Sequence, residues 1–195
     1  MNAIPFNRAW RLRILAVAVV VGFSAFRLPP GSTPGSAASD DNAAGVDAAV
    51  VASRLVDAII QIESGGDPRR VGRHGERGLM QIRSGTWRDM TARLYGAPLP
   101  FDQAFDPEIN RRVGMEYLAT LQATLRKNRD QWKADERTLL LAAYNAGPGR
   151  LRTSGFDPDF MPRQTRDYVE RASALHDALL QDLAEPVRLL LLASL

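Results

Sequence analysis

Residues 55–68 read LVDAIIQIESGGDP and place a carboxylate at the end of an otherwise apolar run. The apolar residues and the carboxylate follow the three- and four-residue spacing of one helix face: Leu55, Val56, Ile59, Ile60 and Glu63. The glycine pair at 65 and 66 predicts a left-handed helix end, and the proline at 68 predicts a stop. This stretch therefore predicts an amphipathic helix that carries Glu63 on its buried face.

Glu63 is the unusual residue of that helix. It shares a face with Ile59 and Ile60, and it lies in the last turn, where the negative end of the helix dipole disfavours an anion. Both effects predict a raised pKa. A carboxyl group that stays protonated near neutral pH suits the general acid of a glycoside-cleaving enzyme. The alternative is a boundary glutamate that caps the helix or pairs with a neighbouring arginine.

The rest of the chain also shows helical signals. A short helix is expected from residue 86 to about residue 94, and Asp106 and Asp135 are expected to cap two more. The Gly147-Pro148-Gly149 stretch predicts a firm stop, and a last helix contains Tyr168. Since no long run alternates apolar and polar residues, the predicted fold class is mainly α.

The first 45 residues have a different composition. Three arginines precede an apolar run of 13 residues, 14–26, and Pro, Gly, Ser and Ala follow. This layout is typical of a bacterial export signal, and the run is shorter than the roughly 20 residues of a spanning helix. A cleaved signal is the first reading and an uncleaved anchor the second. We expect residues 1–26 to be this segment, 27–45 a disordered linker, 46–181 the folded domain and 182–195 an apolar C-terminal tail.

Composition and charge argue against several classes of function. The chain of 195 residues has no cysteine, which excludes disulfides and thiolate metal sites. The net charge of +3 comes partly from the arginines of the first 45 residues, and no long basic run indicates nucleic acid. His74 and His176 lack metal-ligand spacing, so we expect surface roles for both. No metal, cofactor or nucleic-acid partner is therefore expected.

Two further motifs suit a carbohydrate site. RGLMQI, residues 77–82, has Gly78 where backbone can approach a ligand, and the amide of Gln81 can donate to and accept from sugar hydroxyls. AYNAGPG, residues 143–149, sets Tyr144 and Asn145 side by side at a helix end. Each motif alone also fits a purely structural role: RGLMQI as an ordinary buried turn, and AYNAGPG as a core tyrosine beside a capping asparagine.

Taken together, ES, GLMQI and AYNAG in this order resemble the catalytic domain of the soluble lytic transglycosylase family, relatives of goose-type lysozyme. The resemblance runs from about residue 50 to residue 177 and includes DPEINRRVGMEYL, residues 106–118, and PRQTRDYV, residues 162–169. It implies a lysozyme-like helical fold with a groove for peptidoglycan glycan strands. It also implies that Glu63 is the catalytic acid and that the following residues bind substrate: Ser64, Met80, Gln81, Tyr144, Asn145 and Tyr168.

The chain departs from the family pattern in two places. Gln164 stands where many members have glutamate, so we expect altered substrate positioning more than lost chemistry. The stretch RRVGRHGER, residues 69–77, is more basic than the family pattern. It is either a solvated surface loop or a contact for acidic peptide stems.

The resemblance also implies a mechanism with one carboxylate. Glu63 would protonate the oxygen between N-acetylmuramic acid and N-acetylglucosamine and then take the proton of the muramic 6-hydroxyl, which closes a 1,6-anhydro ring. Asp67 and Glu76 are close in sequence, but neither falls on a catalytic family position. A hydrolytic muramidase with a second acid, and an inactive wall-binding or secretion-associated protein, remain open alternatives.

The expected setting follows from the leader and the substrate. We expect an exported protein of the periplasm or cell envelope, which either is released or stays tethered to the membrane through its N-terminal segment. Peptidoglycan is the expected partner, and secretion or cell-wall machinery is a further one.

Overall fold

The computed structural model describes residues 38–193, and side chains from residue 48 to residue 183, as an assembly of helices. The helices are α1 Ala38–Ser64, α2 Ser84–Tyr95, η2 Phe101–Phe105, α3 Pro107–Arg126, η3 Arg129–Gln131, α4 Glu136–Ala146, α5 Pro148–Thr153, η4 Pro158–Phe160 and α6 Arg163–Ala193. Within this range there is no strand, only isolated bridges that join Arg77 to Val71 and to Ile82. The predicted mainly α fold class is confirmed.

The predicted helix ends lie where the capping residues stand. The α1 helix ends at Ser64, and Gly65 and Gly66 follow with φ angles of 65° and 84°. The Asp106 carboxylate accepts the backbone N–H groups of residues 108 and 109, both at 2.9 Å. The Asp135 carboxylate accepts the N–H of Thr138 at 3.0 Å. Local capping chemistry therefore sets these three boundaries.

Other boundaries differ from the sequence prediction. Gly147, with a φ of 88°, does end α4, but Pro148 opens the short helix α5 at once instead of continuing the stop. The α1 helix begins at Ala38, inside the segment expected to be a linker, where its alanines favour helix. The α6 helix continues past residue 181 into the expected tail. The predicted signal or anchor and the first part of the linker lie outside the described residues, and the division into domains stays a prediction.

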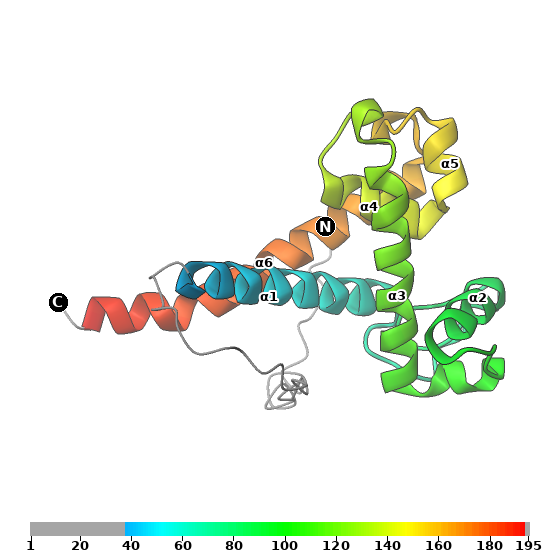
Figure 1. The fold of residues 1–195 in the computed structure, drawn as a ribbon, viewed down its shortest axis with the longest axis horizontal. Coiled ribbons are helices and arrows are strands. Elements are labelled where there is room, and N and C mark those ends of the chain that lie inside the picture. Colours follow the sequence, from blue (N-terminus) through cyan, green and yellow to red (C-terminus); the bar gives the residue numbers. More distant parts are fainter. Residues whose placement is uncertain (1–37, 194–195) are drawn as a thin grey trace, which may run out of the picture. The chain divides into compact units, whose positions relative to one another are not determined.

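The core forms where four long helices meet. The α1 and α6 helices lie side by side, and α3 runs past the end of α1 and contacts α2 and α4 (Figure 1). The largest fully buried apolar side chains come from α1 to α5 and from the loops between the helices: Ile59, Ile60, Met80, Trp87, Val113, Leu121, Leu139, Leu141, Leu151 and Met161. None of the described helices is long and apolar enough to cross a membrane.

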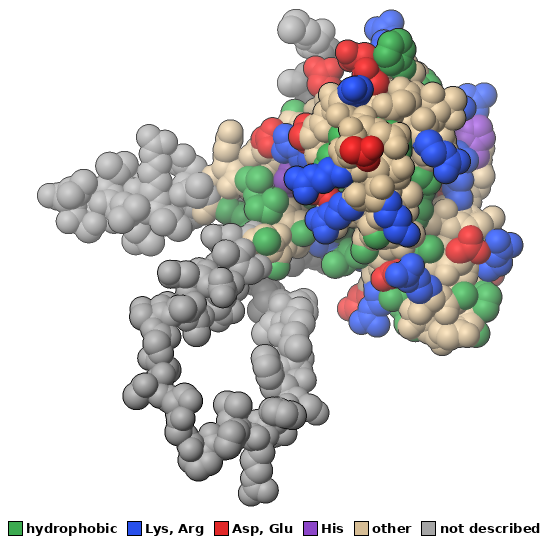
Figure 2. Space-filling model, turned by 45° about the horizontal axis from the view of Figure 1, so that its top comes forward, with side chains coloured by type: hydrophobic (Ala, Val, Ile, Leu, Met, Phe, Trp, Pro, Cys, Tyr) green, Lys and Arg blue, Asp and Glu red, His purple; other side chains and the backbone are tan. Residues whose placement is uncertain are grey.

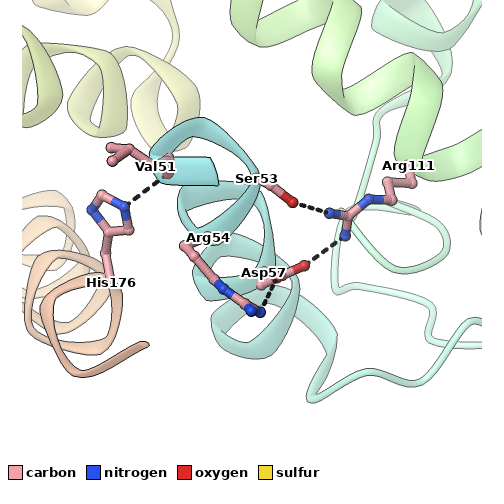
Figure 3. A network of polar contacts seen from close by, with 6 residues as sticks. All are labelled: Val51, Ser53, Arg54, Asp57, Arg111 and His176. Carbon is pink, nitrogen blue, oxygen red and sulfur yellow. Dashed lines mark hydrogen bonds and ion pairs between the residues drawn. The ribbon is translucent and has the colours of Figure 1, made fainter. Parts of the chain in front are cut away.

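A polar network fixes α1 against its neighbours (Figure 3). Arg111 of α3 donates to Asp57 at 2.8 Å and to Ser53 at 3.4 Å. Arg54, one turn before Asp57, contacts the other carboxylate oxygen at 3.2 Å. Because Glu63 lies at the end of the same helix, this network also helps to set the position of Glu63.

His176 corrects one sequence expectation. Its side chain is 3% exposed, so it is buried and not a surface residue as predicted. One ring nitrogen, Nε2, lies 3.0 Å from the backbone oxygen of Val51 in α1 (Figure 3). The other, Nδ1, lies 3.2 Å from Nη1 of Arg137 in α4. The arginine is a donor only, so the ring accepts at Nδ1 and donates at Nε2. The imidazole therefore joins α6 to two other helices.

The surface mixes both signs of charge. Figure 2 shows basic side chains spread over the visible face, with acidic side chains between them. Several of them form exposed ion pairs, such as Arg88 with Asp89 and Arg126 with Glu136. Such pairs contribute little to stability.

Candidate active site

Glu63 lies in the last turn of α1, next to the buried Ile59 and Ile60. Burial, with a smaller contribution from the negative charge of Glu76, raises the pKa of its carboxyl group to about 7. The Tyr168 hydroxyl and the charge of Arg171 act in the opposite direction and are outweighed. Glu63 forms no ion pair with any described residue. The predicted raised pKa of Glu63 is confirmed, and the alternative, a boundary glutamate paired with an arginine, is not supported.

Two tyrosines lie close enough to this carboxyl group for its charge to act on them: Tyr168, which is buried, and Tyr144, which is half-buried. Burial raises the pKa values of Tyr144 and Tyr168 well above the ordinary value, and the charge of Glu63 adds to both shifts. Both hydroxyls therefore keep their protons. The Tyr144 hydroxyl donates to the backbone oxygen of Met80 at 2.7 Å, and its ring lies 5.6 Å from that of Tyr117.

The Tyr168 hydroxyl is poorly satisfied. It is close enough to Glu63 to affect the pKa of the carboxyl group. Yet among the described residues it has no hydrogen-bond partner with good geometry, although the side chain is only 3% exposed. An unpartnered buried hydroxyl costs free energy and is rare in folded proteins, and a role in catalysis is one explanation for it.

The α1–α2 loop, residues 65–83, follows Glu63 and contacts Tyr144 through the backbone oxygen of Met80. Asn110 of α3, which is fully buried, holds this loop with its side-chain amide. It accepts the N–H of Met80 at 2.8 Å and donates to the backbone oxygens of Arg77 at 3.0 Å and Ala104 at 2.8 Å. A side chain at Gly78 would clash with Asn110 and with Ala104. The close approach of loop and helix therefore requires glycine at 78.

The loop orients Gln81. Its backbone has a φ of 46°, which is uncommon for a residue other than glycine. Its amide nitrogen donates to the backbone oxygens of Arg70 at 3.1 Å and Gly78 at 2.9 Å. The amide oxygen consequently points the other way, toward Gly72.

The structure assigns different positions to the other predicted substrate-binding residues. Met80 has 0% exposure, so its side chain packs in the core and lines no open surface. The Ser64 hydroxyl donates to the Ile60 oxygen at 3.1 Å and accepts the Gly66 N–H at 3.2 Å, so it secures the end of α1. Asn145 is half-buried in the last turn of α4, beside Tyr144. The structure thus brings Glu63, Tyr144 and Tyr168 together, and it leaves Met80 as internal support.

Two residues of the site were not predicted. Asn110 lies three and four residues before the buried Val113 and Gly114, so a polar residue on the apolar face of α3 was the available signal. Glu76 is the other. Its carboxylate accepts the N–H of His74 at 2.9 Å and the Nε–H of Arg83 at 3.0 Å. Burial raises the pKa of Glu76, but the backbone N–H groups and Arg83 outweigh burial and hold it below the ordinary value.

A hollow lies beside the site on the first turns of α6. It has a volume of about 640 Å³ and is lined by Arg163, Gln164, Asp167, Glu170 and Arg171. Arg171 ties it to the site, because the charge of that residue acts on Glu63. Among the described residues, no group of three or more potential ligands is arranged for a metal ion.

A protein-family model described as the transglycosylase SLT domain matches residues 43–158, more than half of the chain. The chain belongs to the SLT family. The resemblance expected from the motifs is therefore confirmed.

Relatives of this SLT chain include an endo-type membrane-bound lytic murein transglycosylase A from Cronobacter sakazakii, which is 30% identical over 135 residues. That match covers 66% of each protein. The soluble lytic murein transglycosylase of Escherichia coli is 37% identical over 98 residues, which cover 49% of this chain and 14% of that protein. The SLT chain thus spans only part of the length of these relatives.

The solved structures agree on the fold. An inactive glutamate-to-glutamine mutant of the lytic transglycosylase Slt from Pseudomonas aeruginosa matches with a TM-score of 0.55 and 29% identity. The match covers 68% of the SLT chain described here and 22% of the Pseudomonas chain. The predicted lysozyme-like helical fold is confirmed.

Proposed function

We propose that this SLT chain is a peptidoglycan lytic transglycosylase. It cleaves the β-1,4 bond between N-acetylmuramic acid and N-acetylglucosamine and leaves 1,6-anhydro ends. The observation that carries the proposal is the carboxyl group of Glu63: burial raises its pKa to about 7, and two tyrosines that keep their protons lie near it. Relatives named lytic murein transglycosylases support the substrate class.

The first step needs a proton donor. With a pKa of about 7, a large share of Glu63 carries a proton at neutral pH, whereas an ordinary glutamate would be ionised. The proton passes to the oxygen of the scissile bond, and that bond breaks as positive charge develops at the anomeric carbon of the muramic residue. The substrate's own acetamido group stabilises this charge.

The second step reverses the role of Glu63. The carboxylate takes the proton of the muramic 6-hydroxyl, and that oxygen forms a bond to the anomeric carbon. Glu63 regains its proton, and no water is consumed. The inactive form of the Pseudomonas relative carries a glutamate-to-glutamine change, which fits a reaction that depends on one carboxyl group.

Other residues position the sugar in this proposal. Gln81 and Asn145 offer amide groups to hydroxyl and acetamido groups, and Tyr144 and Tyr168 supply rings and hydroxyl donors. Ser64 acts indirectly, since its hydroxyl secures the helix end that carries Glu63. Met80 stabilises the α1–α2 loop through its backbone, whose N–H donates to Asn110 and whose oxygen accepts from Tyr144.

The location of the protein is part of the proposal. An envelope location, bacterial and periplasmic, suits a murein substrate, and the relatives include membrane-bound and soluble forms. We propose that residues 1–26 serve as an export signal or as an anchor, which would tether the domain to the membrane near its substrate. Secretion or cell-wall machinery would be the corresponding protein partner.

Mass spectrometry of the products tests the activity. The full chain and its Glu63→Gln variant are incubated with purified peptidoglycan, and the released muropeptides are weighed. We expect ends lighter by one water from the native chain and at least about a hundredfold fewer from the variant. Equal release by both would contradict the role of Glu63, and no release by either would favour a wall-binding role.

A further inference from the structure

An exposed aromatic side chain stands in the turn before α6. Phe160 is 78% exposed, the largest value among the exposed large apolar side chains of the described residues. The backbone around it is nevertheless fixed. The Asp157 carboxylate accepts the N–H of Asp159 at 2.9 Å, which caps η4. Nη1 of Arg166 donates to the backbone oxygens of Asp159 at 3.0 Å and Met161 at 2.8 Å. A well-fixed turn therefore holds the Phe160 ring in solvent.

Phe160 borders a hollow between α5 and η4, which we call the α5–η4 hollow. Its volume is about 540 Å³, and it is lined by Arg150, Thr153, Ser154, Phe160, Met161 and Pro162. This volume lies within the roughly 300–1,000 Å³ of small-molecule sites. The hollow therefore has room for a ligand that covers the face of the aromatic ring.

The polar groups of the α5–η4 hollow complement sugar hydroxyls. The Thr153 hydroxyl donates to the Gly149 oxygen at 3.0 Å, and the Ser154 hydroxyl donates to the Leu151 oxygen at 2.7 Å. Each hydroxyl has thus used its proton and can only accept from a ligand. Arg150 forms no ion pair with any described residue, and its guanidinium can only donate. Since a sugar hydroxyl both donates and accepts, it can bond to either kind of group.

The charge of the lining also favours a sugar. Arg150 is the one charged residue among the six that line the hollow. A stem peptide carries several charges, and a single guanidinium would leave most of them without a partner. A neutral sugar ring needs no such partners, and its apolar face can pack on an aromatic ring. A glycan therefore matches this hollow better than a peptide does.

The α5–η4 hollow continues the two elements that carry the site. The α5 helix begins at Pro148, directly after the α4 helix that carries Tyr144, and both α5 and η4 contact α4 (Figure 1). On the other side, η4 leads through Pro162 into α6. The Pro162 oxygen accepts the N–H of Thr165 at 2.9 Å, one turn before Tyr168. A linear polymer that passes the two tyrosines can therefore extend into the hollow.

We propose that the α5–η4 hollow is a distal sugar subsite. In it, the Phe160 ring stacks on an N-acetylated sugar of the same glycan strand whose scissile bond lies at Glu63. Arg150 donates to hydroxyl or acetamido oxygens of that sugar, and the hydroxyls of Thr153 and Ser154 accept from it. The subsite adds affinity for long strands and takes no part in bond cleavage. This inference rests on the proposed function, which supplies the identity of the polymer.

Binding of peptide-free glycan strands tests the subsite. The full chain carries Glu63→Gln so that the strands stay uncut, and calorimetry gives the dissociation constants of long strands and of tetrasaccharides. Adding Phe160→Ala should weaken the binding of long strands by about tenfold and leave the affinity for tetrasaccharides unchanged. Adding Arg150→Gln instead should weaken the binding of long strands by about fivefold.

Tyr95→Ala is the matched control, because Tyr95 is also an exposed aromatic residue but lies at the end of α2. It should leave both affinities unchanged. An unchanged affinity for long strands in Phe160→Ala, or an equal loss for long strands and tetrasaccharides, would overturn the subsite. A loss that appears only with strands that keep their stem peptides would assign the hollow to the peptide and overturn the sugar subsite.

The proposed function has a separate readout, the release of 1,6-anhydro ends by the native chain. If the native chain releases these ends while Phe160→Ala leaves binding unchanged, the subsite is overturned and the proposed function stands. If long strands bind through Phe160 but the native chain releases no such ends, the proposed function is overturned and the hollow is confirmed as a wall-binding site.

Discussion

The end of α1 and the α1–α2 loop each carry one glutamate, Glu63 and Glu76, and the surroundings of these residues shift their pKa values in opposite directions. Glu63 sits among apolar and aromatic side chains, and burial raises its pKa to about 7. Glu76 has a lowered pKa because N–H donors and Arg83 outweigh the effect of burial. The comparison teaches that protonation state here depends on the donors around a carboxylate and not on burial alone.

The two regions also differ in how they are held. Glu63 belongs to a long helix fixed by packing and by the Arg111–Asp57 ion pair. The loop has no regular structure of its own and depends on the side chain of Asn110. We therefore expect the loop to be the easier of the two to displace.

Asn110→Ala is expected to have the largest effect, because it removes the partner of three backbone groups, two of them in buried hydrogen bonds. The cost should be about 4 kcal/mol in the free energy of unfolding. Chemical denaturation measures it, with Asn128→Ala as control, because half-buried Asn128 donates only to the Thr124 oxygen of its own helix end. A loss below about 1 kcal/mol would mean that the loop is held by other contacts.

Glu63→Gln should alter the pH dependence of stability. The folded chain keeps the Glu63 proton up to a pH of about 7, whereas the ordinary value of 4.5 applies on unfolding. Stability from this group is therefore full below pH 4.5 and is lost as pH rises through 7, by up to about 3 kcal/mol. The amide does not titrate. Relative to the native chain, Glu63→Gln should gain about 3 kcal/mol between pH 4 and pH 8, as measured by denaturation at both pH values. A constant difference would place the Glu63 pKa near its ordinary value.

Tyr168→Phe should have a smaller and directional effect. The hydroxyl lowers the pKa of Glu63, so its removal should move the alkaline limb of the pH profile of kcat/KM upward. Glu76→Gln removes a charge that raises the same pKa, so that limb should move downward. Shifts of this limb in opposite directions in the two variants would support the contrast between Glu76 and Tyr168, and shifts in the same direction would contradict it. Tyr95→Phe, in an exposed position at the end of α2, serves as control.

Gln164→Glu is expected to have the smallest effect. Gln164 is exposed on the first turn of α6, beside the hollow that contains Arg171. A new charge there should change KM by no more than about fivefold and leave the pH optimum in place. A large fall in kcat with unchanged KM would show that this position takes part in the acid–base step.

Local patterns carried much of the fold. The spacing of Leu55, Ile59 and Glu63, together with the glycines that follow, predicted the buried face and the end of α1 correctly. Asp106 and Asp135 marked the starts of α3 and α4 because capping involves only neighbouring residues. The same patterns placed Glu63 on an apolar face, which was enough to predict the direction of its pKa shift.

The remaining features depend on contacts between distant residues. His176 is buried because it meets Val51, which lies 125 residues away in the chain. Asn110 meets Met80 and Arg77 only after α3 has packed on the loop. The burial of the Met80 side chain and the orientation of Glu76 likewise need the assembled fold. These contacts do not follow from the local spacing of residues, so they could not be predicted from the sequence.

The most direct test of the account is the titration of the glutamate carboxyl groups by NMR. Side-chain carboxyl carbons are labelled, and Glu63→Gln and Glu76→Gln spectra identify the two signals. We predict a midpoint of about 7 for Glu63 and one below the ordinary value of 4.5 for Glu76. Midpoints near 4.5 for both residues would contradict the account, since the site would then hold no proton to donate at neutral pH.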